Sequence, residues 1–315
     1  MDTIFCGLNI NNSQTPMLRK MHVERKPSWI RTKIPSGPLY NRVNYVLRSK
    51  GLFTVCKEAL CPNVAECWGR GTATIMLLGD TCTRSCRFCA VKAGNPMGRV
   101  DASEPERVAM AVSELNLNYV VLTSVCRDDL RDGGAGIFAE TVRAIKRTSP
   151  NVRVEVLIPD FRGDKDAIRM VVNSKPDVIG HNLETVKRLT PIIRDRRASY
   201  DLSLSVLKTV KELDSSIYTK SSLMLGLGET EQEIVEAMLD LRSVGVDILT
   251  LGQYLRPTRR HMPVVEYVHP ETFERLKKVA LSLGFKCVAS APLMRSSYMA
   301  AELFQSISRD DAFGG

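Results

Sequence analysis

The 315-residue sequence has no run of about 18 apolar residues, and aromatic residues make up only 6% of it. The first absence excludes a membrane-spanning helix of ordinary length. The first twenty residues also lack the pattern of a secretory signal or of an acid-free transit peptide, because they contain Asp2 and a polar stretch at 11–14. We therefore expect a disordered tail over residues 1–24, with Cys6 incidental, in a cytoplasmic protein.

The composition is that of a globular protein, with 44% hydrophobic and 25% charged residues. This length suits one barrel domain with extensions. The net charge of +9 permits an acidic partner, which could be a nucleic acid, an acidic protein or an anionic cofactor. Because aromatic residues are few, the sequence offers no interleaved platform for stacking bases, and we expect no nucleic acid partner.

Nine cysteines are present, and six of them fall between Cys56 and Cys89. In a chain of this length without a secretory signal, clustered cysteines are more typical of metal ligands than of disulfides. We expect Cys126 and Cys287, which stand alone, to be buried structural thiols.

The first cysteine group is Cys82-x3-Cys86-x2-Cys89, in a short loop after an expected strand. Three thiolates hold three irons of a cubane cluster and leave the fourth iron free for chemistry, whereas closed structural sites usually have four ligands. Phe88 stands just before the last cysteine. A zinc knuckle or a disulfide cluster is the alternative interpretation.

The second group is Cys56-x4-Cys61-x5-Cys67, and again no fourth cysteine lies nearby. Two sets of three thiolates in one short region are hard to explain as a single metal site. The sequence therefore predicts two [4Fe-4S] clusters.

From Thr74 onward, apolar runs alternate with segments of helical periodicity. This alternation predicts a parallel sheet covered on its outer face. Six units are fewer than the eight of a complete barrel, so we predict an α/β fold with a partial, open (β/α)6 TIM-type barrel, and a doubly wound sheet is the alternative. The expected strands are 75–78, 119–122, 152–158, 178–179, 222–225 and 248–251, and the expected helices are 104–115, 137–146, 166–172, 202–213 and 231–244.

Around the barrel we expect an N-terminal extension over 25–72, the barrel over 73–284, and a C-terminal extension over 285–315. The first extension should contain a helix at 40–50, and the second a strand at 285–289. Capping boxes are expected at Ser103 and Thr230. The spacing of residues 291–298 predicts an ordinary helix start.

Polar residues follow the strands where barrel chemistry is found, at the carboxyl ends. Thr123 follows the second strand, and Asn182 and Glu184 follow the fourth, where amide and carboxylate groups suit the hydroxyls of a ribose. We interpret His181 as a core histidine with satisfied hydrogen bonds. By default, we expect Asp128, Asp129 and Asp132 to shape a turn, and Gly226 to allow a close approach of the backbone. The stretches 194–197 and 256–261 are expected to face solvent, although one of their arginines could bind a carboxylate.

The chain resembles lipoyl synthases of the radical S-adenosylmethionine superfamily from about Arg25 to Tyr298. The three-cysteine motif alone indicates only the superfamily, and the second cysteine set joined to a terminal Arg-Ser-Ser-Tyr is more specific. The residues that carry the resemblance are Arg25–Pro27, both cysteine sets, Asp128–Leu130, Asp132–Gly134, His181–Asn182, Glu184–Thr185, Gly226–Glu229, Gly252–Tyr254, Pro257 and Arg295–Tyr298.

The resemblance implies insertion of two sulfur atoms at carbons 6 and 8 of an octanoyl chain bound to a carrier-protein lysine. The cluster on Cys82, Cys86 and Cys89, with S-adenosylmethionine bound near Phe88, Thr123, Asn182 and Glu184, would generate a carbon radical. The auxiliary cluster would donate sulfur, with Ser297 as its fourth ligand beside Cys56, Cys61 and Cys67. The implied partners are octanoylated E2 domains of 2-oxoacid dehydrogenases, the glycine cleavage H protein, a ferredoxin or flavodoxin, and iron-sulfur assembly proteins.

The sequence departs from the family pattern at Cys126, Ala291, Met299 and near Arg256, none of which is an implied cluster ligand. Two rival functions remain open at this point. One is a radical enzyme that places sulfur on transfer RNA, although the compact cysteine sets and short C-terminal extension do not favour it. The other is an iron-sulfur carrier, which would not need a barrel of this size.

Overall fold

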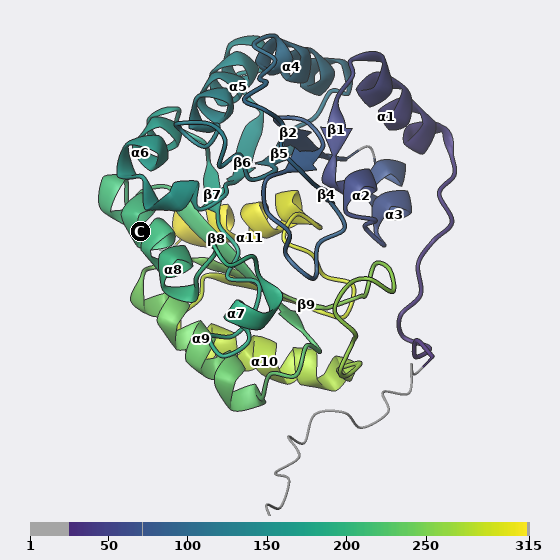
Figure 1. Ribbon diagram of the computed structural model, residues 1–315, viewed down its shortest axis with the longest axis vertical. Coiled ribbons are helices and arrows are strands. Elements are labelled where there is room, and N and C mark those ends of the chain that lie inside the picture. Colours follow the sequence, from purple (N-terminus) through teal and green to yellow (C-terminus); the bar gives the residue numbers. More distant parts are fainter. Residues whose placement is uncertain (1–24, 71, 314–315) are drawn as a thin grey trace, which may run out of the picture.

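The computed structural model describes residues 25–70 and 72–313 (Figure 1). The tail predicted for residues 1–24, with Cys6, lies outside the described residues. In the described part of the chain, no helix is long and apolar enough to cross a membrane. The cytoplasmic location expected from the sequence stays a prediction.

A curved eight-stranded sheet forms the centre of the molecule, in the order β1-β2-β5-β6-β7-β8-β9-β10 (Figure 1). Neighbouring strands are parallel except for β1 and β2. The strand order follows the chain order without the reversal of a doubly wound sheet, and the sheet does not close, so the predicted open barrel is confirmed. The strands are β1 (Phe53–Thr54), β2 (Thr74–Leu77), β5 (Tyr119–Ser124), β6 (Arg153–Leu157), β7 (Val178–Gly180), β8 (Tyr218–Leu225), β9 (Ile248–Gln253) and β10 (Cys287–Ser290).

Helices cover the outer face of the sheet, as the alternating pattern predicts (Figure 1). Each presents a buried apolar stripe to the strands, and burying one Val, Leu, Ile or Phe side chain contributes about 1.5 to 3 kcal/mol. The covering helices are α4 (Glu104–Glu114), α5 (Ala135–Thr148), α6 (Lys165–Asn173), α8 (Tyr200–Leu213), α9 (Glu231–Ser243) and α10 (Pro270–Ser282). A short helix α7 (Thr190–Ile193) follows β7, and a 3-10 turn η1 (Phe161–Gly163) follows β6.

Of the two expected capping boxes, one is present. The Thr230 side chain accepts a hydrogen bond from the backbone of Glu233, whose carboxylate binds back to the Thr230 backbone. The prediction at Ser103 is wrong, because its side chain makes no cap hydrogen bond. Instead the hydroxyl of Ser103 donates to Asp101, and the Glu104 carboxylate accepts from the Leu78 backbone at 2.9 Å, which fixes the helix to the end of β2.

The N-terminal extension contains α1 (Pro38–Ser49), α2 (Val55–Glu58) and α3 (Val64–Gly69). The expected helix at 40–50 is confirmed and begins two residues earlier, at Pro38, where a proline is favourable because the first helical N–H has no intrahelical acceptor. Trp68 is completely buried and packs against Tyr40, with ring centroids 5.1 Å apart. This contact packs α3, which contains Cys67, against α1.

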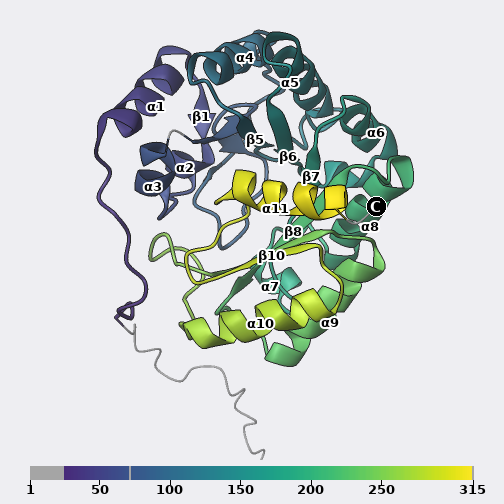
Figure 2. The ribbon, with the colours of Figure 1, turned by 180° about the vertical axis from the view of Figure 1, so that it is seen from behind.

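The C-terminal extension adds β10 to the sheet and ends in α11 (Ala300–Phe313). Figure 2 shows α11 lying across the back of the barrel. There the ring of Phe304 contacts Tyr119 and Tyr218, at the first residues of β5 and β8, with centroids 5.8 and 5.9 Å apart. The strand expected at 285–289 is present and lies at 287–290. The boundaries expected from the sequence for the two extensions and the barrel stay predictions.

The expected helix start within 291–298 is wrong. These residues form turns, and the helix begins only at Ala300. Met299 has a φ of +54°, a left-handed conformation that an α-helix cannot include. The turns leave the backbone of 291–298 free to bind the N-terminal extension.

Candidate functional site

A cavity of about 630 Å³ opens at the carboxyl ends of the strands. The extensions at both ends of the chain also contribute to its wall. Nine of the eleven residues predicted as site residues line it: Cys61, Cys82, Cys86, Phe88, Cys89, Thr123, Asn182, Glu184 and Ser297. Of the other two, Cys56 is buried, and the partly buried Cys67 packs against the barrel core.

The loop that carries Cys82, Cys86 and Cys89 is held by Arg84, which sequence reasoning missed. This buried guanidinium binds Asp128 at 2.8 and 3.0 Å and Asp160 at 2.5 and 2.8 Å. Burial alone would lower the pKa of Arg84, but the hydrogen bonds to the two carboxylates raise it overall. Because Asp128 follows β5 and Asp160 follows β6, Arg84 fixes the loop to two strands of the barrel.

The segment after α7 holds the same loop from the other side. Asp195 is buried, accepts a hydrogen bond from the Ser85 backbone at 3.0 Å, and donates its own backbone N–H to the Cys86 sulfur at 3.3 Å. Arg197 binds Asp195 and donates to the Thr83 carbonyl at 2.6 Å. The default interpretation of 194–197 as a solvated face is therefore wrong for Arg194 and Asp195, whereas Arg196 and Arg197 are exposed as expected.

The three thiols of this loop differ in their surroundings. A hydrogen bond with the Cys126 thiol lowers the pKa of Cys82 to about 6, whereas burial raises the pKa of Cys86 and raises that of Cys89 to about 12. Cys126 is thus more than a packed core residue, because it is only partly buried and lines the cavity with Cys82. Iron binding must replace the protons of the buried thiols, so cluster formation releases protons here.

Asn182 and Glu184 lie after β7 in a strained backbone. Glu184 has a φ of +70°, and its backbone N–H and C=O bind Ser222 and Met224 of β8 at 3.0 and 2.9 Å. Burial raises the pKa of its carboxyl. Strain of this kind persists where the surrounding structure imposes it and is frequent at ligand sites.

Three buried polar atoms of the cavity wall have no hydrogen-bond partner within the described residues. They are Oδ1 of Asn182, Oγ of Ser124 and Nε of Arg194. An unpaired buried polar atom costs about 1 to 3 kcal/mol, so these atoms are suited to bind a polar ligand. A cofactor with hydroxyl, amino and carboxylate groups, such as S-adenosylmethionine, fits this wall.

His181 and Gly226 have the structural roles expected from the sequence. His181 is buried, with Nδ1 2.9 Å from the Ile158 carbonyl and Nε2 3.0 Å from the Ser203 hydroxyl, and burial lowers its pKa to about 4. A Cβ on Gly226 would lie 2.2 Å from Gln253 and from the Glu266 carbonyl. Neither residue points to acid-base chemistry.

The C-terminal turns lie against the auxiliary cysteine segment. Asn63 donates its side-chain amide to the Leu293 carbonyl at 2.7 Å, and the Tyr298 hydroxyl binds Glu66 at 2.9 Å. Both contacts join residues more than 200 positions apart in the sequence. They bring Ser297 to the cavity wall that Cys61 also lines.

Burial raises the pKa of all three auxiliary thiols, to about 11 for Cys56 and about 12 for Cys67. The eight cysteines of the described residues are all free thiols. Among those residues, no three His, Cys, Asp or Glu side chains gather closely enough for a single metal ion. A cubane binds each thiolate at a different iron, so its ligands stand further apart, and soft thiolates suit such a cluster.

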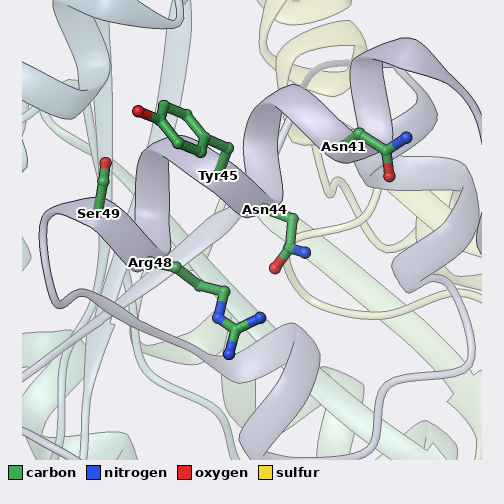
Figure 3. A pocket seen from close by; sticks show the side chains of 5 residues that line it. All are labelled: Asn41, Asn44, Tyr45, Arg48 and Ser49. Atoms are coloured by element: carbon green, nitrogen blue, oxygen red, sulfur yellow. The ribbon is translucent and has the colours of Figure 1, made fainter.

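A second hollow lies on the outer side of α1, lined by Asn41, Asn44, Tyr45, Arg48 and Ser49 (Figure 3). None of these residues belongs to the predicted site. The chemistry-bearing side chains are at the barrel mouth.

The chain is similar to radical SAM proteins and to lipoyl synthases. Residues 76–241 match the radical SAM superfamily, and residues 10–61 match the N-terminal domain of lipoyl synthase of the Radical_SAM family. A lipoyl synthase of Thermus thermophilus is 57% identical over 279 residues, covering 89% of this chain and 86% of that protein. A lipoyl synthase of Pyrobaculum arsenaticum is 56% identical over 281 residues, with 89% and 95% covered.

The chain belongs to the lipoyl synthase family.

Solved structures give the same fold at much lower identity. Methylornithine synthase (PylB) has a TM-score of 0.51 at 13% identity, covering 76% of this chain and 80% of that one. Streptococcus suis SuiB bound to the precursor peptide SuiA has a TM-score of 0.54 at 11% identity, covering 79% and 52%. At such identities the likeness shows the fold alone.

Membership in the lipoyl synthase family confirms the predicted enzyme class, a radical SAM sulfurtransferase of lipoate biosynthesis. It implies one [4Fe-4S] cluster and S-adenosylmethionine, and Cys82, Cys86 and Cys89 would hold that cluster. The polar residue that sequence reasoning missed, Arg84, lies within the loop of the three-cysteine motif. Only tertiary contacts reveal its role, because an isolated Arg has no periodic signal.

Proposed function

We propose that this protein uses two [4Fe-4S] clusters to insert sulfur at carbons 6 and 8 of an octanoyl chain bound to a carrier-protein lysine. The observation that carries the proposal is that all three cysteines of the first set and one of the second, Cys61, line the same cavity. Cys82, Cys86 and Cys89 line one part of its wall, and Cys61 and Ser297 line another. A radical formed at the first set and sulfur held at the second would then reach the same substrate.

Unactivated carbons have no acidic proton for a base to remove, so a carbon radical is the reagent that the reaction needs. The first cluster and S-adenosylmethionine supply that radical when bound, and the second cluster supplies sulfur. The protein must hold these groups in a site that excludes side reactions.

The polar wall is suited to bind S-adenosylmethionine. Asn182 and Glu184 would bind the ribose hydroxyls, since amide and carboxylate oxygens accept hydrogen bonds from a diol. Arg194 offers a guanidinium for the cofactor's carboxylate. Phe88 and Thr123 complete this side of the cavity.

The apolar wall is suited to bind the octanoyl chain. Ile30, Val55, Ala59, Leu60 and Val91 line the cavity. Each buried CH2 group contributes about 0.8 kcal/mol, so an eight-carbon chain is retained without specific polar contacts. This wall includes residues next to the auxiliary cysteines, where sulfur transfer would take place.

Ser297 would bind the auxiliary cluster as its fourth ligand and would take part in catalysis by leaving it. An alkoxide oxygen is harder than a thiolate and matches a soft cluster iron less well. The bond to Ser297 would therefore be the easiest one to break when the cluster gives up sulfur.

The partners follow from this reaction. The substrates would be octanoylated E2 domains of 2-oxoacid dehydrogenases and the glycine cleavage H protein. A ferredoxin or flavodoxin would supply electrons, and iron-sulfur assembly proteins would rebuild the auxiliary cluster.

The test is an anaerobic reaction of the reduced holoenzyme with a short octanoyl-lysyl peptide, followed by mass spectrometry. We expect a product that has gained two sulfur atoms, together with 5'-deoxyadenosine and methionine. A C61A variant should still form 5'-deoxyadenosine but no sulfur-containing product. A protein that forms 5'-deoxyadenosine yet places sulfur only on transfer RNA would overturn the proposal.

A further inference from the structure

Two segments that form part of the cavity wall are basic and contain no acidic residue. Residues 25–34 include four Lys or Arg, and residues 255–265 include three. Both segments line the cavity, the first through Lys26, Ile30 and Thr32 and the second through Leu255, Arg256 and Pro257. We call the seven cations of these segments the basic rim: Arg25, Lys26, Arg31, Lys33, Arg256, Arg259 and Arg260.

Most cations of the basic rim face solvent without a counter-ion. All except Arg256 are exposed. Within residues 25–70 and 72–313, only Lys33 approaches a carboxylate, that of Glu66 at 4.0 Å. Apart from Lys33, the rim cations therefore have no ion-pair partner within 4.0 Å among the described residues, although the exposed Glu266 directly follows the second segment. Their positive potential extends into solvent over about a Debye length, roughly 8 to 10 Å at physiological salt.

The second segment is hydrogen-bonded to the loop that carries Cys82, Cys86 and Cys89. His261 places Nε2 3.0 Å from the Cys89 carbonyl, and the Met262 backbone donates to the Arg87 carbonyl at 2.9 Å. The Arg256 side chain donates to the His261 carbonyl at 2.8 Å. Arg259 and Arg260 are thus attached to a rigid part of the mouth.

The two segments also approach each other. The Trp29 ring meets the ring of His269 edge-on, with centroids 5.2 Å apart. His269 lies just beyond the second segment, so this contact helps to join the two halves of the rim.

We propose that the basic rim docks an acidic face of the octanoylated carrier domain. The inference rests on the proposed function. A folded domain cannot enter a cavity of about 630 Å³, so only its lysine arm goes in and its surface must rest against the rim. Opposite charges at such a rim speed association and orient the partner.

RNA is also anionic, but proteins that bind single strands add exposed aromatic rings on which bases stack. The two segments contain one Trp, Tyr or Phe between them, Trp29, which is exposed but meets His269 edge-on, and a single ring is no platform for successive bases. The rim therefore favours an acidic protein over RNA.

The test measures binding of the anaerobic holoenzyme to the octanoylated glycine cleavage H protein by calorimetry, and to a short, uncharged octanoyl-lysyl peptide. We expect the double variant R259E/R260E to bind the H protein at least about tenfold more weakly, with peptide binding unchanged. Wild-type binding to the H protein should weaken as salt rises. A matched reversal away from the mouth, K208E/K278E, changes exposed lysines of α8 and α10 and should bind like wild type.

Several outcomes would overturn the proposal. These are equal affinities for R259E/R260E and the control variant, an equal loss of peptide binding, or tighter wild-type binding to transfer RNA than to the H protein. Conversion of the short peptide separates the two hypotheses. If wild type converts the peptide but the rim variant binds the carrier normally, only the docking proposal fails.

Discussion

At the scale of single residues, Ser297 matters most for the proposed sulfur transfer. It lines the cavity within the terminal Arg-Ser-Ser-Tyr, on a backbone held by Asn63 and by the Tyr298–Glu66 hydrogen bond. Its hydroxyl would bind iron less firmly than the three neighbouring thiolates. A replacement that strengthens this bond should therefore slow the reaction.

The first prediction concerns the Ser297→Cys variant. We expect it to retain iron and to form 5'-deoxyadenosine, but to yield the sulfur-containing product at least about tenfold more slowly, because a fourth thiolate keeps the cluster closed. Product is measured by mass spectrometry against Ser296→Cys, which adds a thiol at the adjacent cavity residue and should retain most of the activity. Undiminished turnover by Ser297→Cys would contradict the ligand role.

The second prediction concerns Arg84, whose guanidinium neutralises two carboxylates. Removing one member of a buried ionic network typically costs about 3 to 5 kcal/mol, because the remaining charges stay unpaired. We expect Arg84→Met to lower the free energy of unfolding by this amount in urea titrations. Arg84→Lys should lower it by less, since it keeps the charge but loses the bidentate fork.

The matched control is Arg143→Met, which removes an arginine from an exposed ion pair with Glu140. Exposed pairs contribute about 0 to 1 kcal/mol, so this variant should unfold almost like wild type. Similar stabilities for Arg84→Met and Arg143→Met would mean that Arg84 does not hold the cluster loop.

At the scale of elements, the turns at 291–298 pack tightly against β9. A Cβ on Gly252 would lie 2.1 Å from the Met294 carbonyl oxygen, far inside contact distance. Backbone cannot give way as a flexible side chain can, so any larger residue at 252 must displace the segment that contains Ser297.

The third prediction follows for Gly252→Ala. We expect this variant to lose the auxiliary cluster and keep the first one, so that iron content falls by about half relative to a two-cluster protein. Gly69→Ala is the control, because a Cβ there meets nothing within 4 Å. Full iron content in Gly252→Ala would show that the second cluster does not depend on the position of residues 291–298.

The six barrel strands and their helices could be predicted from sequence, because buried parallel strands and covering helices have clear periodicity. The helix start predicted within 291–298 is wrong, because Met299 adopts a left-handed backbone and tertiary hydrogen bonds determine the turns. The cysteines were evident from spacing. The contacts that hold them were not, because Arg84 meets Asp160, and Ser85 meets Asp195, only when distant parts of the chain assemble.

At the scale of the whole molecule, the barrel brings the first cysteine set, Cys61 and parts of both extensions to one mouth. The N-terminal extension supplies the auxiliary cysteines, the C-terminal turns supply Ser297, and the strand ends supply the polar wall. Meanwhile α11 packs at the opposite end of the strands. Substrate would therefore enter from the side where both clusters are expected.

Counting the clusters tests the central claim most directly. Iron and sulfide should be measured, with Mössbauer spectra, in anaerobically reconstituted wild type and in a variant with Cys56, Cys61 and Cys67 changed to Ala. We predict about eight irons per chain in wild type and about four in the variant, all in cubane clusters. About four irons in both proteins, with the auxiliary thiols of wild type free or bound to zinc, would contradict the account.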